Sequence, residues 1–211
     1  MGRIELKYDD GQTPLEEEEK DGLLPTAVTT KGELDEVEQR NIEDAIRWTM
    51  QRRKKFKKEE ILTEAFVMEL HKTMFGEVWK WAGEFRKTDK NLGVSKYQIG
   101  TDLKVLLDDC AYWIDHNIYE ADEIAIRLKH RIVLIHCFAN GNGRHSRLIA
   151  DIIVEKVFGK KVFSWGSVQL AQQGIARASY LQALREADKG NYAPLIVFAR
   201  SLCGIGILIV D

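Results

Sequence analysis

The fold is decided by residues 121–158, which read ADEIAIRLKHRIVLIHCFANGNGRHSRLIADIIVEKVF. The first part repeats apolar residues at the period of one helix face, at Ile124, Leu128, Ile132 and Ile135. The last part is apolar almost all round, at Leu148, Ile149, Ile152, Ile153, Val154, Val157 and Phe158. A helix of that kind belongs at the centre of a bundle. The stretch therefore predicts helices over 121–136 and 144–158, with Asn140-Gly141-Asn142-Gly143 between them.

The helical period recurs on both sides of this stretch. It predicts further helices over 33–50, 59–75, 102–114, 176–187 and 192–202, with Thr101 and Asp102 as candidate caps of the third. The period is lost over residues 86–100, where Val94, Tyr97 and Ile99 suit short strands. The predicted fold class is therefore all-α, a helical bundle that carries one β-hairpin flap.

The ends of the chain differ from its middle. Residues 1–32 are expected to form an N-terminal extension, partly irregular, because Glu16-Glu17-Glu18-Glu19 is a like-charge run of the kind that is usually solvated and mobile. Residues 33–203 are expected to form the domain, and residues 204–211 an apolar tail that packs on it. The basic run at residues 52–58 favours a solvated loop between helices over a nucleic-acid site, since it is one short patch on a mildly acidic chain.

Composition excludes several classes of protein. A net charge of −2 provides no basic field for nucleic acid, and no apolar run is long enough for a transmembrane helix. The first residues lack the apolar stretch of a signal peptide. Three cysteines at wide spacing, Cys110, Cys137 and Cys203, fit neither a disulfide framework nor a zinc site, which favours a cytoplasmic location. Cys137 adjoins His136, but neighbours on a helix point about 100° apart, so adjacency does not make a catalytic pair.

The loop between the two central helices has the properties of an anion site. Asn-Gly is also typical of a hairpin turn, but both flanks here have the helical period. Gly141 and Gly143 permit close backbone approach, and the following helix adds unpaired N–H donors and its dipole. Arg144 and Arg147 share one helix face and supply two cations, while His136 can deprotonate an incoming hydroxyl. We therefore expect a nucleotide-using transferase.

These residues resemble the signature of the Fic family, His-x-Phe-x-(Asp/Glu)-Gly-Asn-Gly-Arg-x-x-Arg. The matching positions are His136, Phe138, Gly141, Asn142, Gly143, Arg144 and Arg147. Trp81-Ala82-Gly83-Glu84-Phe85-Arg86 resembles the segment that leads into the family's target-binding flap, and Tyr180 lies in a segment similar to the helix after the nucleotide pocket. Asn140 and the residues from Leu24 to Leu34 are most similar to a small subgroup called mobile mystery protein B.

The resemblance implies transfer of AMP from ATP to a hydroxyl side chain of a protein. His136 would be the general base. The α- and β-phosphates would be held by Gly141, Asn142 and Gly143, and the β- and γ-phosphates by Arg144 and Arg147. Tyr180 would line the nucleotide pocket. Residues 86–100, with Thr88, Lys90 and Tyr97, would dock the target protein by strand addition. Asn140 replaces the acidic residue that binds Mg²⁺ in the family, and its neutral amide oxygen can still ligate that cation.

A restraint on activity is also implied. Thr29-Thr30-Lys31-Gly32-Glu33-Leu34 resembles the family's inhibitory motif, (Ser/Thr)-x-x-x-Glu-(Gly/Asn), up to its last position. Glu33 or Glu38 would then pair with Arg147 and displace the terminal phosphate; the alternative is a solvated acidic helix. Other activities stay open: transfer of another phosphate-linked group, removal of AMP, or a weakly catalytic, toxin-like module bound by an antitoxin. A homodimer is a further possible assembly, whereas nucleic acid and membrane are not expected partners.

Overall fold

The computed structural model describes residues 15–51, 56–165 and 173–201. Its helices, in chain order, are α1 (Glu17–Lys20), α2 (Lys31–Met50), α3 (Lys58–Ile61), α4 (Glu64–Phe75), α5 (Ile99–Asp115), α6 (Ala121–Ile135), α7 (Asn142–Ile152), the π-helical turn η1 (Ile153–Val157), α8 (Gln173–Asp188) and α9 (Ala193–Arg200). Over these ranges the only β-type pairing is an isolated bridge between Leu23 and Trp79. The all-α fold class is confirmed.

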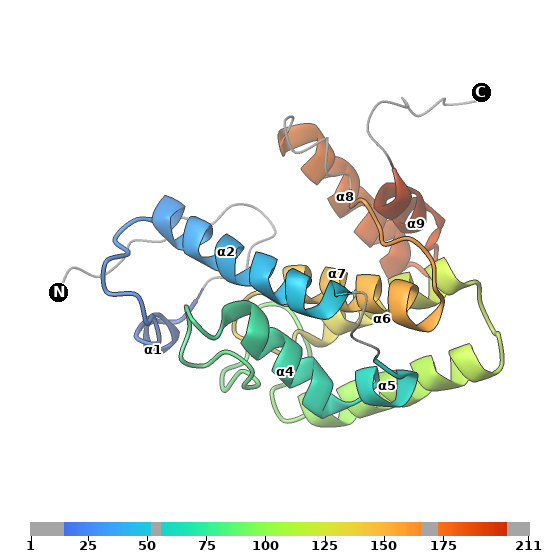
Figure 1. The fold of residues 1–211 in the computed structure, drawn as a ribbon, viewed down its shortest axis with the longest axis horizontal. Coiled ribbons are helices and arrows are strands. Elements are labelled where there is room, and N and C mark those ends of the chain that lie inside the picture. The colour runs from blue at the N-terminus through green and yellow to red at the C-terminus, as the bar shows by residue number, and fades with distance from the viewer. Residues whose placement is uncertain (1–14, 52–55, 166–172, 202–211) are drawn as a thin grey trace.

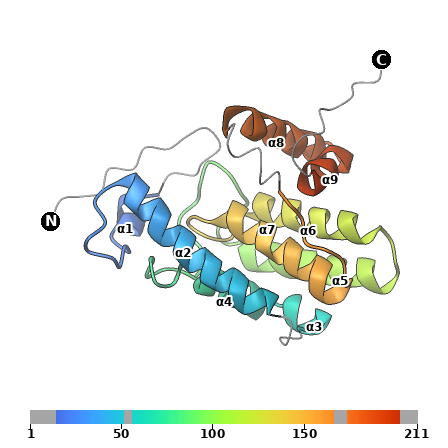
Figure 2. The ribbon, with the colours of Figure 1, turned by 45° about the horizontal axis from the view of Figure 1, so that its top comes forward.

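The two helices of residues 121–158 lie at the centre of the bundle (Figure 1). α6 and α7 pack against each other, α5 packs on α6, and α2 and α4 form a neighbouring pair that contacts α7. The apolar faces that the sequence predicted are buried, with Ile132, Ile149 and Ile153 each 0% exposed. α8 and α9 pack together and reach the bundle through α6 (Figure 2).

Several helix boundaries differ from the prediction. The helix expected over 59–75 is divided at Leu62, because Thr63 caps α4 by accepting the N–H of Phe66 at 3.1 Å. Thr101 and Asp102 are not caps: α5 begins at Ile99, with Gln98 as its N-cap. The helix expected over 144–158 begins two residues earlier, at Asn142, and changes to a π-helical turn at its end.

The N-terminal acidic run is ordered by one of its members. Glu16, Glu17 and Glu18 are exposed, as expected of a like-charge run, whereas Glu19 is half-buried. The carbonyl of Glu19 accepts the indole N–H of Trp81 at 2.8 Å. The following residues continue this contact, since the N–H of Lys80 donates to the Gly22 carbonyl at 2.8 Å. α1 is therefore fixed to the turn that leads into residue 86.

The segment expected to be a β-hairpin forms no strand. We call residues 86–98 the flap segment. Its backbone bonds run to the end of α6 instead of across a hairpin: the N–H of Arg86 donates to the Cys137 carbonyl at 2.9 Å, and that of Val94 to the Ile135 carbonyl at 3.3 Å. The buried Arg86 side chain occupies the space between the two halves, bonding the carbonyls of Thr88 and Val94, which prevents them from pairing.

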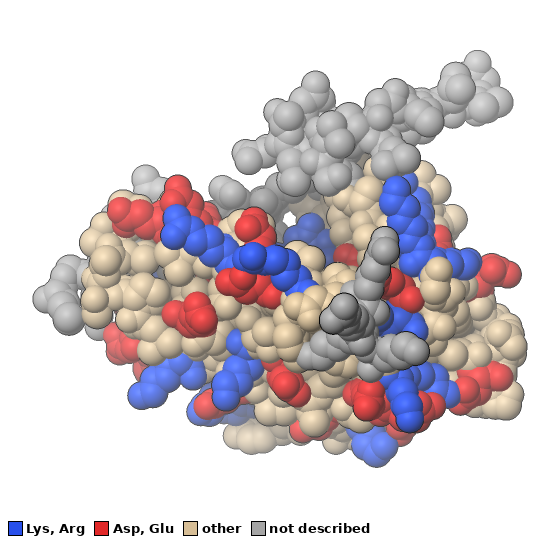
Figure 3. All heavy atoms as spheres, viewed as in Figure 1, with Lys and Arg blue, Asp and Glu red and all other residues tan. Residues whose placement is uncertain are grey.

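Some predictions fall on residues outside the described ranges. They concern residues 1–14 of the N-terminal extension, residues 52–55 of the basic run, residue 202 of the last predicted helix, Cys203 and the apolar tail at 204–211. Within the described residues, no helix is both long and apolar enough to cross a membrane. On the face seen in Figure 3, basic and acidic side chains intermingle, in line with the small net charge.

Candidate functional site

His136 ends α6 in a strained conformation. Its φ and ψ are 57° and 61°, the left-handed region that side chains other than glycine seldom adopt. Its N–H still closes the helix by donating to the Ile132 carbonyl at 3.0 Å. Backbone strain of this kind persists where the surroundings impose it, and it is concentrated at functional sites. The left-handed turn begins what we call the signature loop, residues 136–143.

Asn142 shapes the signature loop from within. Its side-chain oxygen accepts the N–H of Phe138 at 3.0 Å, and its side-chain nitrogen donates to the Phe138 carbonyl at 2.8 Å. Both residues are buried. The Asn142 side chain is thus engaged within the signature loop. Its backbone N–H is the group left to bind a phosphate.

The glycines of the loop have different roles. Gly141 has a φ of +79°, and a Cβ there would lie 2.6 Å from the ring of Phe75, so a larger residue does not fit. Gly143 is exposed and surrounded by open space. α7 begins between them at Asn142 with no side-chain cap. The N–H groups of its first turn and the positive end of its dipole are therefore available to an anion.

The two arginines of α7 are engaged differently. Arg144 donates from Nη1 to Glu38 Oε2 at 2.6 Å and lies over the Phe75 ring at 4.8 Å. Arg147 donates from Nε to the Gly143 carbonyl at 3.3 Å. Arg144 is thus paired with a carboxylate of α2, whereas Arg147 is bonded to the backbone of the signature loop.

The two candidate inhibitory glutamates lie in unlike places. Glu33 caps its own helix by accepting the N–H groups of Thr29 at 2.8 Å and Thr30 at 3.0 Å, and these bonds lower the pKa of its carboxyl. Glu38 is 4% exposed and accepts the Trp79 indole N–H at 2.6 Å in addition to its bond from Arg144. The ion pair made by Glu38 is therefore with the first motif arginine, whereas the sequence reasoning named Arg147.

Tyr180 meets an unexpected partner. Its hydroxyl oxygen accepts a hydrogen bond from Lys129 Nζ at 2.5 Å, and the ammonium lies 4.7 Å from the centre of its ring. Lys129 is fully buried on α6, and burial lowers the pKa of its ammonium, with a smaller lowering contribution from the charge of Arg147. Tyr180 is thus connected to the core of the bundle through a buried lysine of α6.

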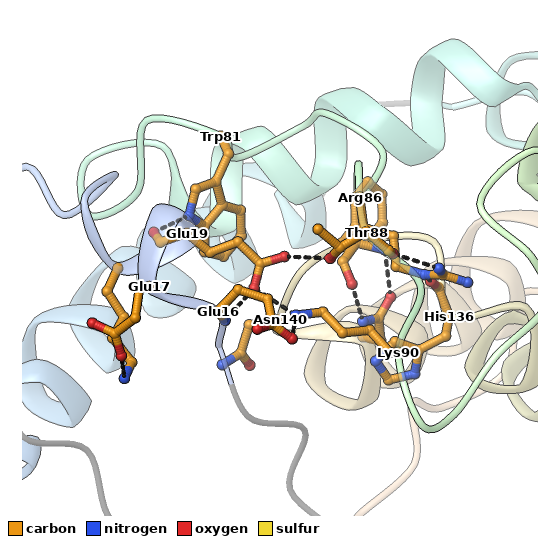
Figure 4. A network of polar contacts seen from close by, with 12 residues as sticks. Glu16, Glu17, Glu19, Trp81, Arg86, Thr88, Lys90, His136 and Asn140 are labelled. Atoms are coloured by element: carbon orange, nitrogen blue, oxygen red, sulfur yellow. Dashed lines mark hydrogen bonds and ion pairs between the residues drawn. The ribbon is translucent and has the colours of Figure 1, made fainter.

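The flap residues face two directions. Thr88 donates to Glu19 Oε1 at 3.1 Å and Lys90 Nζ lies 2.6 Å from Glu19 Oε2, so both bind α1 (Figure 4). The Lys90 side chain is only 2% exposed. Tyr97, in contrast, is 84% exposed. The sequence grouped these residues as one target-binding surface, and only Tyr97 is free of the α1 contact.

The flap segment lies directly against His136. Arg86 Nε donates to the His136 carbonyl at 2.7 Å, and a Cβ on Gly93 would lie 2.5 Å from the Cβ of His136. In Figure 4, Lys90 extends from the same segment toward Glu16 and Glu19. One short segment therefore connects the candidate base to the N-terminal helix.

His136 is held in its neutral form. Burial lowers the pKa of its imidazole to about 4, and the charges of Arg86 and Lys90 act in the same direction, while a backbone bond to Val133 opposes them. At neutral pH the ring is therefore a proton acceptor. Burial also raises the pKa of the Cys137 thiol to about 12, which leaves no thiolate for nucleophilic chemistry.

Asn140 is the one predicted metal ligand. Its side-chain oxygen accepts the N–H of Gly141 at 2.5 Å, and its carbonyl bonds to Nε2 of His71 at 3.0 Å. Within the described ranges, no group of three or more His, Cys, Asp or Glu side chains is placed to hold a metal by itself.

The sequence alone did not single out four of the residues that build this site: Glu19, His71, Arg86 and Lys129. His71 and Lys129 had a visible signal, since each interrupts the apolar face of a predicted helix. A polar side chain in that position must find hydrogen-bond partners in the core. Glu19 and Arg86 carried no such signal, because their partners are distant in the sequence.

The central part of the chain is similar to known proteins. Residues 61–154 match the model of the Fic/DOC family. The protein adenylyltransferase Fic of Aedes aegypti is 25% identical over 145 residues, which are 67% of this chain and 28% of that protein. Its namesake in Drosophila grimshawi is 27% identical over 136 residues, or 63% and 26% of the two chains. The chain thus spans about a quarter of the length of the curated relatives it matches.

Solved structures share the fold at lower identity. Fic-1 from C. elegans superposes with a TM-score of 0.63 at 22% identity, covering 85% of this chain and 51% of that one. BepC from Bartonella tribocorum, solved with bound AMPPNP, gives 0.62 at 15% identity over 88% of this chain and 97% of its own. The motif, the fold and the family model agree on one part of the chain: residues 61–154 match the Fic/DOC family.

Proposed function

We propose that this chain is a protein adenylyltransferase, which transfers AMP from ATP to a hydroxyl side chain of another protein. One observation carries the proposal: a neutral, buried imidazole begins a loop that ends at an uncapped helix N-terminus beside Arg144 and Arg147. A base and a polyanion site are thus separated by a few residues. The curated relatives that share this domain are named protein adenylyltransferases, which supports the same activity.

The proposed chemistry follows from these positions. His136 accepts the proton of the target hydroxyl, and the resulting oxygen nucleophile attacks the α-phosphorus of ATP. The new oxygen–phosphorus bond forms as the bond from the α-phosphorus to the bridging oxygen breaks, and pyrophosphate leaves. The N–H groups at the start of α7 and the two arginines stabilise the charge on the phosphates, so catalysis rests on positioning and electrostatics.

Mg²⁺ fits this site as a cation shared with the nucleotide. Protein sites for Mg²⁺ commonly use one or two oxygen ligands together with substrate phosphates. The Asn140 side-chain oxygen is such a ligand, and it lies beside the N–H of Gly141 at the mouth of the loop. When bound, the cation would neutralise charge on the phosphates. Because the amide is neutral, we expect weaker metal affinity than an acidic residue would give.

We propose that the flap segment docks the target chain through its main chain. Strand addition needs backbone N–H and C=O groups more than a particular sequence. The contact of Gly93 with His136 places this backbone beside the base, and the exposed Tyr97 offers a side chain at its far end. Thr88 and Lys90 also hold the segment to α1.

We further propose that Glu38 restrains the enzyme. A terminal phosphate that binds Arg144 must first displace the Glu38 carboxylate, which is buried and also bonded to Trp79. The chain would then be autoinhibited through its first motif arginine. Association with an antitoxin or a second copy, a cytoplasmic location and membership of the mobile mystery protein B subgroup stay predictions.

The proposal is tested with ATP labelled at either the α- or the γ-phosphate. Purified protein and cell lysate are incubated with each label and with Mg²⁺, and protein-bound label is counted. Adenylyl transfer puts only the α-label on protein. Equal transfer of both labels, or transfer of the γ-label alone, contradicts it. A parallel panel of UTP, GTP and CDP-choline separates the other phosphate-linked groups, and loss of label from a pre-modified target reveals AMP removal.

A further inference from the structure

His71 is a fully buried histidine outside the family motif. It lies on α4, on the face that also carries Val67, Leu70 and Met74, all of them 0% exposed. An imidazole in such surroundings is unfavourable unless its nitrogens find hydrogen-bond partners. Both ring nitrogens do so, and the partners belong to two different loops.

The two bonds determine which nitrogen carries the proton. The backbone N–H of Gly83 donates to Nδ1 at 3.0 Å, so Nδ1 is the acceptor. Nε2 then bears the hydrogen and donates to the Asn140 carbonyl at 3.0 Å. Burial holds the pKa of His71 well below its ordinary value, which keeps the ring neutral and the assignment unique.

The same ring supports the rest of the signature loop. It stacks on Phe138 with centroids 3.7 Å apart and planes 18° from parallel. A Cβ on Gly141 would lie 3.3 Å from its Nε2. Phe138, Asn140 and Gly141 are therefore all placed by contact with one side chain of α4.

Peptide geometry converts the Asn140 bond into a direction. In a planar trans peptide the C=O and the following N–H point opposite ways. Because His71 holds the Asn140 carbonyl toward the core, the N–H of Gly141 points away from it, to where the Asn140 side-chain oxygen accepts it. A residue of α4 therefore sets the direction of the Gly141 N–H. It also sets the place of the Asn140 side-chain oxygen, the candidate metal ligand, which accepts that N–H.

We propose that His71 is a positioning residue for nucleotide binding, acting through the Asn140–Gly141 peptide. This role rests on the proposed adenylyltransferase function. Gly83 is its counterpart: it has a φ of +82°, and a Cβ there would lie 2.8 Å from the Cβ of Lys72, so only glycine brings this N–H onto Nδ1. The Trp81-Ala82-Gly83 segment thereby determines that Nε2 of His71 carries the proton, and the bond from Nε2 orients the Asn140–Gly141 peptide of the signature loop.

Two variants divide the two bonds of His71. His71→Gln places an amide nitrogen near the position of Nε2 and keeps the donor to Asn140. His71→Asn places an amide oxygen near the position of Nδ1 and keeps the acceptor for Gly83. Both lose the stack on Phe138, so their melting temperatures should fall by similar amounts. His145→Gln is the matched control, since His145 is equally buried and its Nε2 bonds the Val67 carbonyl outside the signature loop.

The first measurement is binding of ADP with Mg²⁺ by calorimetry. We expect His71→Asn to weaken binding about tenfold, which corresponds to about one hydrogen bond, while His71→Gln stays within about threefold of the parent. Equal losses in both variants, or a loss as large in His145→Gln, would overturn the positioning role.

The second measurement does not depend on the proposed function. Imidazole ¹⁵N shifts of the unaltered protein should show Nδ1 without a proton and Nε2 with one, and the Gly141 amide resonance should move further in His71→Asn than in His71→Gln, because both variants lose the ring but only His71→Asn also loses the donor to Asn140. The opposite tautomer, or a Gly141 resonance that moves by the same amount in both variants, overturns the inference even if ADP does not bind. Absence of ADP binding by the unaltered protein, with these shifts as expected, would instead count against the proposed function alone.

Discussion

The guanidinium of Arg86 donates from Nε to the main-chain carbonyl of His136 at 2.7 Å. The same side chain donates to the carbonyls of Thr88 and Val94. It therefore ties the flap segment to the candidate base, and its charge helps to lower the pKa of that base. The segment proposed to dock the target and the proposed base are therefore linked through one residue.

Arg86→Gln should raise the pKa of His136 toward its ordinary value, although burial, the larger cause, remains. Arg86→Lys keeps the charge and should leave that pKa low, while losing the fork that bonds three carbonyls. Titration of the His136 ring protons by NMR distinguishes the two. A pKa that is unchanged in Arg86→Gln would show that the guanidinium does not act on the base.

The stability of the protein should fall in mild acid. Burial lowers the pKa values of His136 and His145 from an ordinary 6.5 to about 4. Between these two pH values the unfolded chain therefore binds protons at these histidines that the folded chain does not bind. Each such group removes about 1.4 kcal/mol of unfolding free energy per pH unit as the pH falls through this window. His71 acts in the same direction.

Asp151 opposes this trend and provides the test. Burial raises the pKa of its carboxyl to about 6, so below pH 6 the folded state gains a proton before the unfolded one does. Asp151→Asn keeps an acceptor for the Phe163 N–H but removes the titration. Urea unfolding at pH 7, 6 and 5 should show a steeper loss in this variant. A slope equal to that of the parent would be inconsistent with a buried, titrating Asp151.

The contact between α1 and the flap segment should order the flap. Glu19→Ala removes the partner of both Thr88 and Lys90, leaving a largely buried ammonium without its closest carboxylate. Amide hydrogen exchange of residues 87–92 should become at least several-fold faster. Glu18→Ala, an exposed neighbour on the same helix, is the control and should leave exchange unchanged. Equal exchange in both variants would mean that α1 does not hold the flap.

Release of Arg144 should strengthen nucleotide binding. Glu38→Gln removes the charge of the ion pair but retains an acceptor for the Trp79 indole. We expect the affinity for a non-hydrolysable ATP analogue, which carries the terminal phosphate, to rise about three- to tenfold, which corresponds to about 0.7–1.4 kcal/mol. Glu43→Gln, exposed on the same helix, serves as the matched change. Unaltered or weaker binding in Glu38→Gln would show that Glu38 does not restrain the site.

The sequence predicted the features that depend on local pattern. The central helices appear where Ile132 and Ile149 recur at the helical period, and the signature loop lies between them as expected. The flap was misjudged because Arg86, 50 residues from its partner His136, takes the carbonyls that a hairpin would use. The Glu38–Arg144 pair spans 106 residues, a separation that no local pattern encodes.

The central claim is that His136 is the base of a nucleotidyl transfer. The most direct test compares His136→Ala with His116→Ala, which alters an exposed histidine at the end of α5. Binding of ADP is measured by calorimetry, and transfer of α-label from ATP to protein is measured on the same samples. We expect His136→Ala to bind ADP within about threefold of the parent but to transfer the label at least about 100-fold more slowly, whereas His116→Ala should bind and transfer as the parent does. Transfer by His136→Ala at the parental rate would contradict it.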